Sequence, residues 1–133
     1  MARILVIDDD EAIRRSVRRL LERVGHTIFE AGDGEAGIAV LRKEPIALVL
    51  TDIYMPREDG FATIRRVRRE WPTVKIITMS GGSRAGPADL NAGAAAMGAA
   101  RTLSKPFDVQ DLIDAVTSVL NEGSPPTPPS PSQ

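Results

Sequence analysis

Acidic residues, one serine and one lysine occur where short apolar runs of the chain end. Three aspartates, Asp8 to Asp10, follow the first run, Asp52 follows a later one, and Ser80 and Lys105 come after two more. Carboxylates gathered in one place repel one another, and their oxygens suit a hard divalent cation such as Mg²⁺. A hydroxyl and an ammonium beside the metal would complete a cradle for phosphoryl oxygens. The predicted chemistry is therefore Mg²⁺-dependent phosphoryl transfer to an aspartate.

Short apolar runs alternate with amphipathic segments along the chain. The apolar runs predict strands over 3–7, 26–30, 46–50, 74–79 and 102–103. Helical spacing predicts helices over 12–24, between 33 and 45, over 61–71, from 87 toward 99, and over 109–120. Aspartates precede three of these helices and are predicted to cap them: Asp10, Asp33 and Asp108.

This alternation predicts an α/β fold, with a doubly wound, five-stranded parallel sheet that is covered by helices on both faces. Ligands of such sheets bind outside the carboxyl ends of the strands. The aspartates, Ser80 and Lys105 all fall at those ends. The predicted fold therefore gathers the residues that could do chemistry at one edge of the sheet.

The composition excludes several classes of site. The chain has no cysteine, which excludes disulfides, thiol nucleophiles and thiolate metal ligands. Its single histidine, His26, excludes the usual histidine-based metal sites, and we expect His26 and Trp71 to be structural. No apolar run approaches the roughly 18 residues of a membrane span, and no signal peptide is recognisable. We expect a cytoplasmic protein without membrane insertion.

The charges almost balance, with 17 Lys+Arg against 18 Asp+Glu and a net charge of -1. Many arginines lie in the predicted helices 12–24 and 61–71, where they alternate with apolar positions and glutamates. Aromatic residues, which could stack on bases, make up only 4% of the chain. We interpret these arginines as solvated helical faces and expect no direct contact with nucleic acid.

Prolines divide the chain into a body and a tail. Of the 10 prolines among the 133 residues, five lie between Pro125 and Pro131. A body of this size suits one compact domain and leaves no room for a second. We predict a folded domain over 1–121 and a disordered Pro/Ser-rich tail over 122–133.

Four short segments match one protein family in order, each at the end of a predicted strand. They are Val6–Asp10, Leu50–Pro56 with Gly60, Met79–Gly81, and Lys105–Phe107. In these segments the chain resembles the receiver domain of two-component response regulators, and the likeness spans residues 3–121. The resemblance implies a (βα)5 flavodoxin-like fold with strand order 2-1-3-4-5. With so short a remainder, the chain is expected to be a receiver of the single-domain type.

The resemblance also implies roles for the acidic residues. Asp52 would be the phosphoacceptor, and it would take a phosphoryl group from a sensor histidine kinase or a histidine phosphotransfer protein. Mg²⁺ would be bound by Asp52, directly by Asp9, through water by Asp8, and by the backbone carbonyl of Tyr54.

Further residues would respond to the phosphoryl group in such a protein. Ser80 and Lys105 would each bind a phosphoryl oxygen, and the Lys105–Pro106 peptide bond would be cis. Ser80 and Thr102 would form the switch, although the family often has tyrosine or phenylalanine at the position of Thr102. A protein of this kind is a phosphoacceptor switch and not an enzyme, since it catalyses only its own phosphorylation and dephosphorylation.

Two different consequences of phosphorylation are compatible with the sequence. A face built by the fourth helix, fifth strand and fifth helix would bind a downstream protein target, in a monomer or a phosphorylation-dependent dimer. Alternatively, the chain would be a phosphorelay intermediate or a phosphate sink. A haloacid-dehalogenase-like phosphatase would also use an aspartate, Mg²⁺ and a lysine, but that family places its nucleophile after the first strand.

Overall fold

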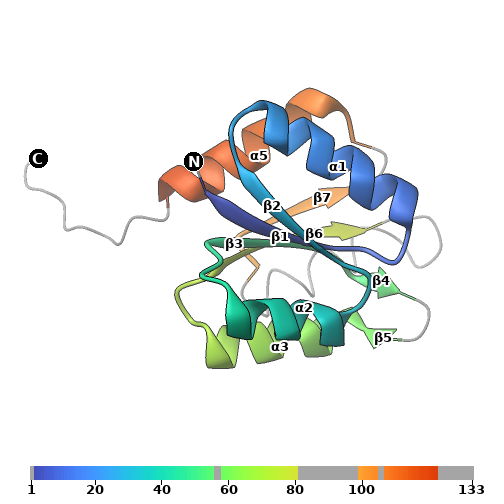
Figure 1. Cartoon of the computed structure of the whole chain (residues 1–133), viewed down its shortest axis with the longest axis vertical. Coiled ribbons are helices and arrows are strands. Elements are labelled where there is room, and N and C mark those ends of the chain that lie inside the picture. The colour runs from blue at the N-terminus through green and yellow to red at the C-terminus, as the bar shows by residue number, and fades with distance from the viewer. Residues whose placement is uncertain (1, 56–57, 81–98, 105–106, 123–133) are drawn as a thin grey trace, which may run out of the picture.

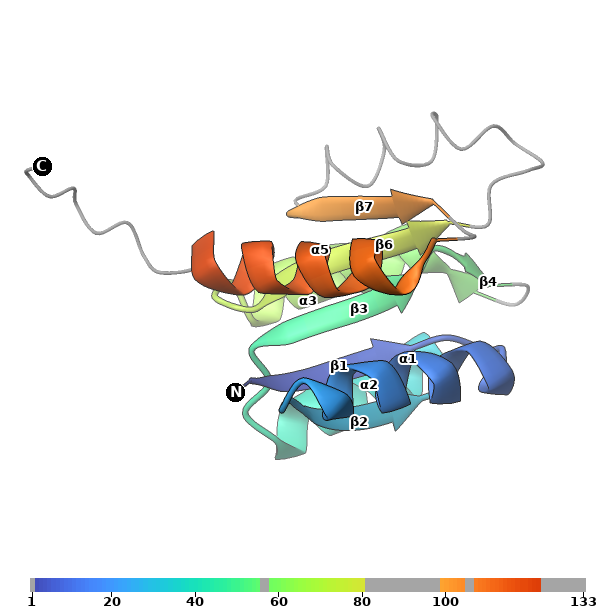
Figure 2. The same cartoon turned by 90° about the horizontal axis from the view of Figure 1, so that it is seen from above.

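A five-stranded parallel sheet runs through the middle of the protein, with helices on both faces (Figure 1). The computed structural model describes residues 2–55, 58–80, 99–104 and 107–122. The strands lie in the order β2-β1-β3-β6-β7 (Figure 2), which confirms the predicted order 2-1-3-4-5. Their bounds are β1 Arg3–Ile7, β2 Thr27–Ala31, β3 Leu48–Asp52, β6 Lys75–Ser80 and β7 Arg101–Ser104.

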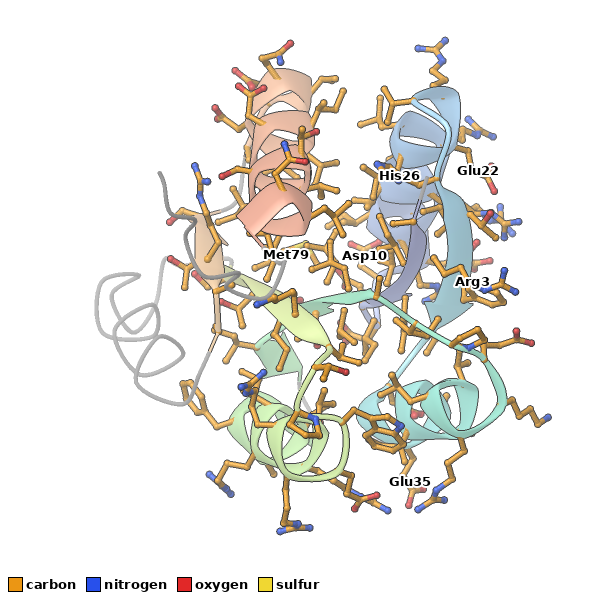
Figure 3. The ribbon with its side chains drawn as sticks, turned by 90° about the vertical axis from the view of Figure 1, so that its left-hand side faces the viewer. Arg3, Asp10, Glu22, His26, Glu35 and Met79 are labelled. Atoms are coloured by element: carbon orange, nitrogen blue, oxygen red, sulfur yellow. The ribbon has the colours of Figure 1, made fainter. Side chains whose placement is uncertain are left out.

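The helices form one layer on each side of the sheet (Figure 3). On one face lie α1 (Glu11–Arg23) and α5 (Val109–Glu122), and on the other lie α2 (Gly34–Lys43) and α3 (Gly60–Glu70). The helix predicted from 87 toward 99 lies outside the described residues, as do residues 123–133 of the predicted tail. Within the described ranges, no helix combines the length and hydropathy that crossing a bilayer requires.

Aspartates begin three of the helices, as predicted. The Asp10 carboxylate accepts from the amides of Ala12 and Ile13 at 3.0 and 3.2 Å. Asp33 accepts from the Ala36 amide at 2.7 Å, and Asp108 from the Asp111 amide at 2.8 Å. These bonds satisfy amides that have no partner within the first turn of a helix. They fix where α1, α2 and α5 start relative to the strand ends that precede them.

The segment after β3 differs from the prediction. The sequence predicts no strand or helix between 50 and 61, but Tyr54–Met55 (β4) and Glu58–Asp59 (β5) pair as a small antiparallel hairpin. Two-residue strands have no hydrophobic period, so the sequence gives no signal for them. In addition, β2, β3 and β6 each begin and end one or two residues later than predicted. The later ends of β3 and β6 arise because the polar residues Asp52 and Ser80 still pair with the neighbouring strand.

Helix α2 packs unusually close to β1. A Cβ atom added at Gly37 would lie 2.5 Å from Cδ1 and 3.0 Å from Cγ1 of Ile7. Ile7 is completely buried, in a core cluster that also contains Ile38 and Leu41 of α2. The absent side chain of Gly37 therefore lets α2 approach the strand that leads directly into the acidic residues.

We predict that Gly37→Ala destabilises the protein even though alanine favours helices. The gain in helix propensity is about 1 kcal/mol, whereas overpacking a core typically costs about 1–3 kcal/mol. The net loss should be about 1 kcal/mol in the free energy of unfolding, measured by urea denaturation. Introducing Gly37→Ala into an Ile7→Val background should remove most of this loss, since valine has no Cδ1 atom. A net gain of about 1 kcal/mol in the wild-type background would contradict the close approach.

Candidate functional site

The register of the sheet brings the two predicted strand-end acids together. Ile7 of β1 lies opposite Thr51 of β3, so the residues that follow them, Asp8 and Asp52, come to equivalent positions at the same edge. On the other side of β3, Asp52 lies opposite Met79, the residue before Ser80. The carboxyl ends of β1, β3 and β6 therefore meet at one place, as the parallel sheet predicted.

Three carboxylates form a cluster at this edge, which we call the acid cluster: Asp8, Asp9 and Asp52. One oxygen from each lies within 4.8 Å of those of the other two. Asp8 is completely buried and Asp52 is 5% exposed, whereas Asp9 is exposed to solvent. The cluster is thus a buried pair of acids with a third acid at its open side.

Hydrogen bonds hold the backbone and the side chain of Asp8 in place. Its amide donates to the Ala31 carbonyl of β2 at 3.1 Å, and its Oδ1 accepts from the Asp10 amide at 2.9 Å. The neighbouring Asp10 has a different task, because its own carboxylate caps α1. The run of three aspartates therefore divides as predicted, with Asp8 and Asp9 in the cluster and Asp10 at the helix.

The acid cluster is suited to a hard divalent cation. Two ionised carboxylates about 5 Å apart repel by about 3 kcal/mol at an effective dielectric constant of about 20. A cation between them turns this repulsion into attraction. The donors are anionic oxygens from three residues, which is the ligand type that Mg²⁺ prefers. These residues fit the predicted metal, and a bound Mg²⁺ would supply positive charge to stabilise phosphoryl oxygens.

The structure describes some of the other predicted site residues but not all of them. Ser80 is completely buried at the end of β6, and Thr102 of β7 lies opposite Thr78. Tyr54 begins the hairpin strand two residues after Asp52. Lys105 and Pro106, with the predicted cis peptide bond, lie outside the described residues. The roles of all these residues remain predictions.

Two residues predicted to be structural lie away from the acid cluster. The Nδ1 atom of His26 accepts from the Ala2 amide at 3.1 Å, next to the start of β1, at the other end of the strand from Asp8. Trp71 follows α3 and packs against the core between the sheet and the α2/α3 layer. Each has a packing or hydrogen-bonding task.

The sequence interpretation missed one residue beside the acid cluster. Arg14 was assigned to the solvated face of α1, but its side chain is only 16% exposed, and its Nη1 donates to the Asp8 carbonyl at 2.6 Å. A signal was present in the sequence, because Arg14 stands three and seven residues before Val17 and Leu21, on the buried side of α1.

A groove beside the acid cluster separates α1 from the start of α5. Its volume is about 260 Å³, and its α1 wall begins at Ala12, two residues after the Asp10 cap. Apolar side chains form most of its walls, and they include Ile13, Val17 and Leu20 of α1 with Phe107 and Val109. Val109 is 48% exposed. The groove thus starts at the end of α1 that follows the acid cluster in the chain.

The doubly wound parallel sheet and the acid cluster at its carboxyl edge define an α/β domain with a candidate cation site. Comparison with protein families makes the assignment specific. The family model for the response regulator receiver domain matches residues 4–117. The chain belongs to this family, whose members are the phosphorylation-dependent switches of two-component systems.

Individual relatives agree with this assignment. The response regulator receiver protein CpdR of Brucella abortus is 35% identical, with 90% of this chain and 98% of CpdR covered. The DNA-binding transcriptional regulator NtrC of Azospirillum brasilense is 36% identical, with 94% of this chain but only 25% of NtrC covered. A CheY-like receiver domain of Methanospirillum hungatei has a TM-score of 0.84 at 28% identity, covering 92% of this chain and 96% of that structure. The chain therefore spans nearly all of one relative and a quarter of another.

We predict that Asp9→Asn weakens Mg²⁺ binding at least about tenfold, since an anionic oxygen ligand is lost. Isothermal titration calorimetry measures the affinity directly, and the rise of the melting temperature with Mg²⁺ gives a second measurement. Asp10→Asn is a matched control, because asparagine caps helices as well as aspartate does. Equal weakening by both substitutions would contradict the division of tasks within the run of aspartates.

Proposed function

We propose that this domain is a receiver in which Asp52 accepts a phosphoryl group while Asp8, Asp9 and Asp52 hold Mg²⁺. The observation that supports this most directly is the acid cluster, with three carboxylates gathered at the edge where receiver chemistry is expected. The backbone carbonyl of Tyr54 would be a further oxygen ligand. In this proposal the domain is a switch, and its only reactions are its own phosphorylation and dephosphorylation.

The proposed reaction with a phosphohistidine donor is a simple displacement. A carboxylate oxygen of Asp52 attacks phosphorus, the phosphorus–nitrogen bond breaks, and the donor imidazole keeps the electron pair and takes a proton. Dephosphorylation replaces the donor with water, and the Asp52 carboxylate leaves as phosphate forms. Burial of Asp52 limits access of water to the acyl phosphate, while the exposed side of the cluster leaves a path for the donor.

The response to phosphorylation would begin at Ser80 and Lys105. An acyl phosphate adds about -1.5 to -2 charge and new hydrogen-bond acceptors. Ser80 is buried on the strand next to Asp52, so a short movement would bring its hydroxyl to a phosphoryl oxygen. Ser80 lies opposite Ser104 of β7, and Thr102 lies two residues earlier on the same strand. The proposed path therefore leads to β7 and α5, and to a downstream protein target.

The groove between α1 and α5 is a suitable surface for the protein that carries the phosphohistidine. It is apolar, it lies beside the acid cluster, and it includes the exposed side chain of Val109. A donor held there would present its imidazole to the open side of the cluster near Asp9. A small phosphodonor needs no such surface, because it reaches the acids through solvent.

We predict that Asp52→Asn abolishes phosphorylation by acetyl phosphate in the presence of Mg²⁺, because the amide is not a nucleophile for this reaction. Intact mass spectrometry should show one added phosphoryl group on the wild-type chain and none on the variant. The added group should be removed by hydroxylamine, which cleaves acyl phosphates but leaves serine phosphate intact. Asp33→Asn, which alters a helix cap, is the control and should be modified normally. Equal modification of Asp52→Asn and wild type would refute the assignment.

We predict that Val109→Lys slows transfer from a phosphorylated histidine phosphotransfer domain about tenfold, because a charge replaces an apolar contact in the groove. The domain used should be one that phosphorylates the wild-type chain. Phosphorylation by acetyl phosphate should be unchanged. Val24→Lys is the matched control, since Val24 is 42% exposed at the opposite end of α1. Slower reaction with both donors would show that the groove is not a docking surface.

A further inference from the structure

Arg14 connects helix α1 to the acid cluster through two strong contacts. Its Nε donates to the Glu30 carboxylate of β2 at 2.9 Å, and its Nη1 donates to the backbone carbonyl of Asp8 at 2.6 Å. Both side chains of the ion pair are mostly buried, with exposures of 16% for Arg14 and 21% for Glu30. The guanidinium is a rigid planar fork, so these two bonds together fix its orientation.

Glu30 is itself held from a second side. Its other carboxylate oxygen accepts from Nη1 of Arg18 at 2.8 Å, and Arg18 also pairs with Glu22 at 2.8 Å. The pKa of Glu30 is lowered mainly by the hydrogen bond from Arg18, with a further contribution from Arg14, and burial opposes the shift only in part. Glu30 is therefore ionised at neutral pH and anchors the Arg14 guanidinium.

The contact with the Asp8 carbonyl also acts on Asp9. The Asp8 carbonyl and the Asp9 amide belong to one planar peptide unit, so fixing the oxygen fixes the direction in which the chain leaves toward Asp9. The buried Asp8 has two further hydrogen bonds, to Ala31 and Asp10. Asp9 is exposed, and burial does not hold its side chain in place.

We propose that Arg14, oriented by Glu30, is a positioning residue that fixes the Asp8–Asp9 peptide unit and so arranges the acid cluster for a divalent cation. The inference rests on the proposed function in taking the cluster as a cation site. Electrostatics alone predicts the opposite effect of removing Arg14, because the loss of a nearby positive charge should favour a cation. A positioning role therefore predicts weaker Mg²⁺ binding when Arg14 is replaced, whereas a purely electrostatic role predicts tighter binding.

The test compares Mg²⁺ affinities of four proteins by isothermal titration calorimetry, at a temperature where urea denaturation shows each to be folded. Arg14→Met and Arg14→Lys should both bind Mg²⁺ about tenfold more weakly than wild type, the usual cost of losing a residue that orients metal ligands. Lysine keeps the charge but cannot bridge Glu30 and the Asp8 carbonyl. Arg18→Met is the matched control, since it removes the same charge and a Glu30 contact, whereas the hydrogen bonds of Arg18 go to Glu22 and Glu30 and not to Asp8. It should stay within about twofold of wild type.

A second measurement does not depend on metal. In the metal-free protein, the ¹H–¹⁵N signal of the Asp9 amide should shift in both Arg14 variants and stay unchanged in Arg18→Met. Unchanged or tighter Mg²⁺ binding by Arg14→Met would overturn the inference, as would equal weakening by Arg18→Met. If the wild-type chain bound no Mg²⁺, the proposed function would fail, and the Asp9 signal would still decide whether Arg14 holds the peptide unit.

Discussion

The repulsion between two buried carboxylates on neighbouring strands is the constraint around which this domain is arranged. The carboxylates of Asp8 and Asp52 lie close together because β1 and β3 pair with Ile7 opposite Thr51. Well-packed apolar residues would serve stability at least as well as buried charges do. The two acids persist in this position only because the rest of the structure holds them, from the hydrogen bonds around Asp8 to the close approach of α2 at Gly37. That arrangement keeps a site ready for positive charge.

The sheet is apolar and buried toward the start of its strands and polar near its carboxyl edge. Residues of β1, β3 and β6 such as Leu5, Leu48 and Ile76 are completely or almost completely buried between the two helix layers. Immediately below the acids, threonines at 51, 78 and 102 lie opposite one another on three adjacent strands. Hydroxyls can exchange hydrogen-bond partners without the repacking that large apolar side chains require.

The sequence predicted the parts of this structure that depend on local patterns. Apolar runs located the five strands of the sheet, and the caps at Asp10 and Asp108 followed from side-chain bonds to amides two or three residues ahead. The resemblance to receivers supplied the strand order. The β4–β5 hairpin and the burial of Arg14 were missed for different reasons. The hairpin is too short to have a period. The position of Arg14 on the buried side of α1 indicated its burial, but its partner Glu30 could not be predicted because their contact joins residues 16 positions apart.

Aspartate and glutamate have different tasks in this chain, and the difference explains how a nearly neutral protein carries a local negative field. Glutamates pair with arginines along the helices, as in the i,i+4 pairs of Arg15 with Glu11 and Arg66 with Glu70. Arginine is nevertheless in excess there, with five arginines against two glutamates in α1 and four against one in α3. The longer glutamate side chain can span a helical turn. Aspartates cap helices and end strands, because a short side chain holds its carboxylate close to the backbone. The nearly neutral total therefore combines arginine-rich helical surfaces with a separate group of carboxylates at the carboxyl edge of the sheet, where we propose that a cation and a phosphoryl group bind.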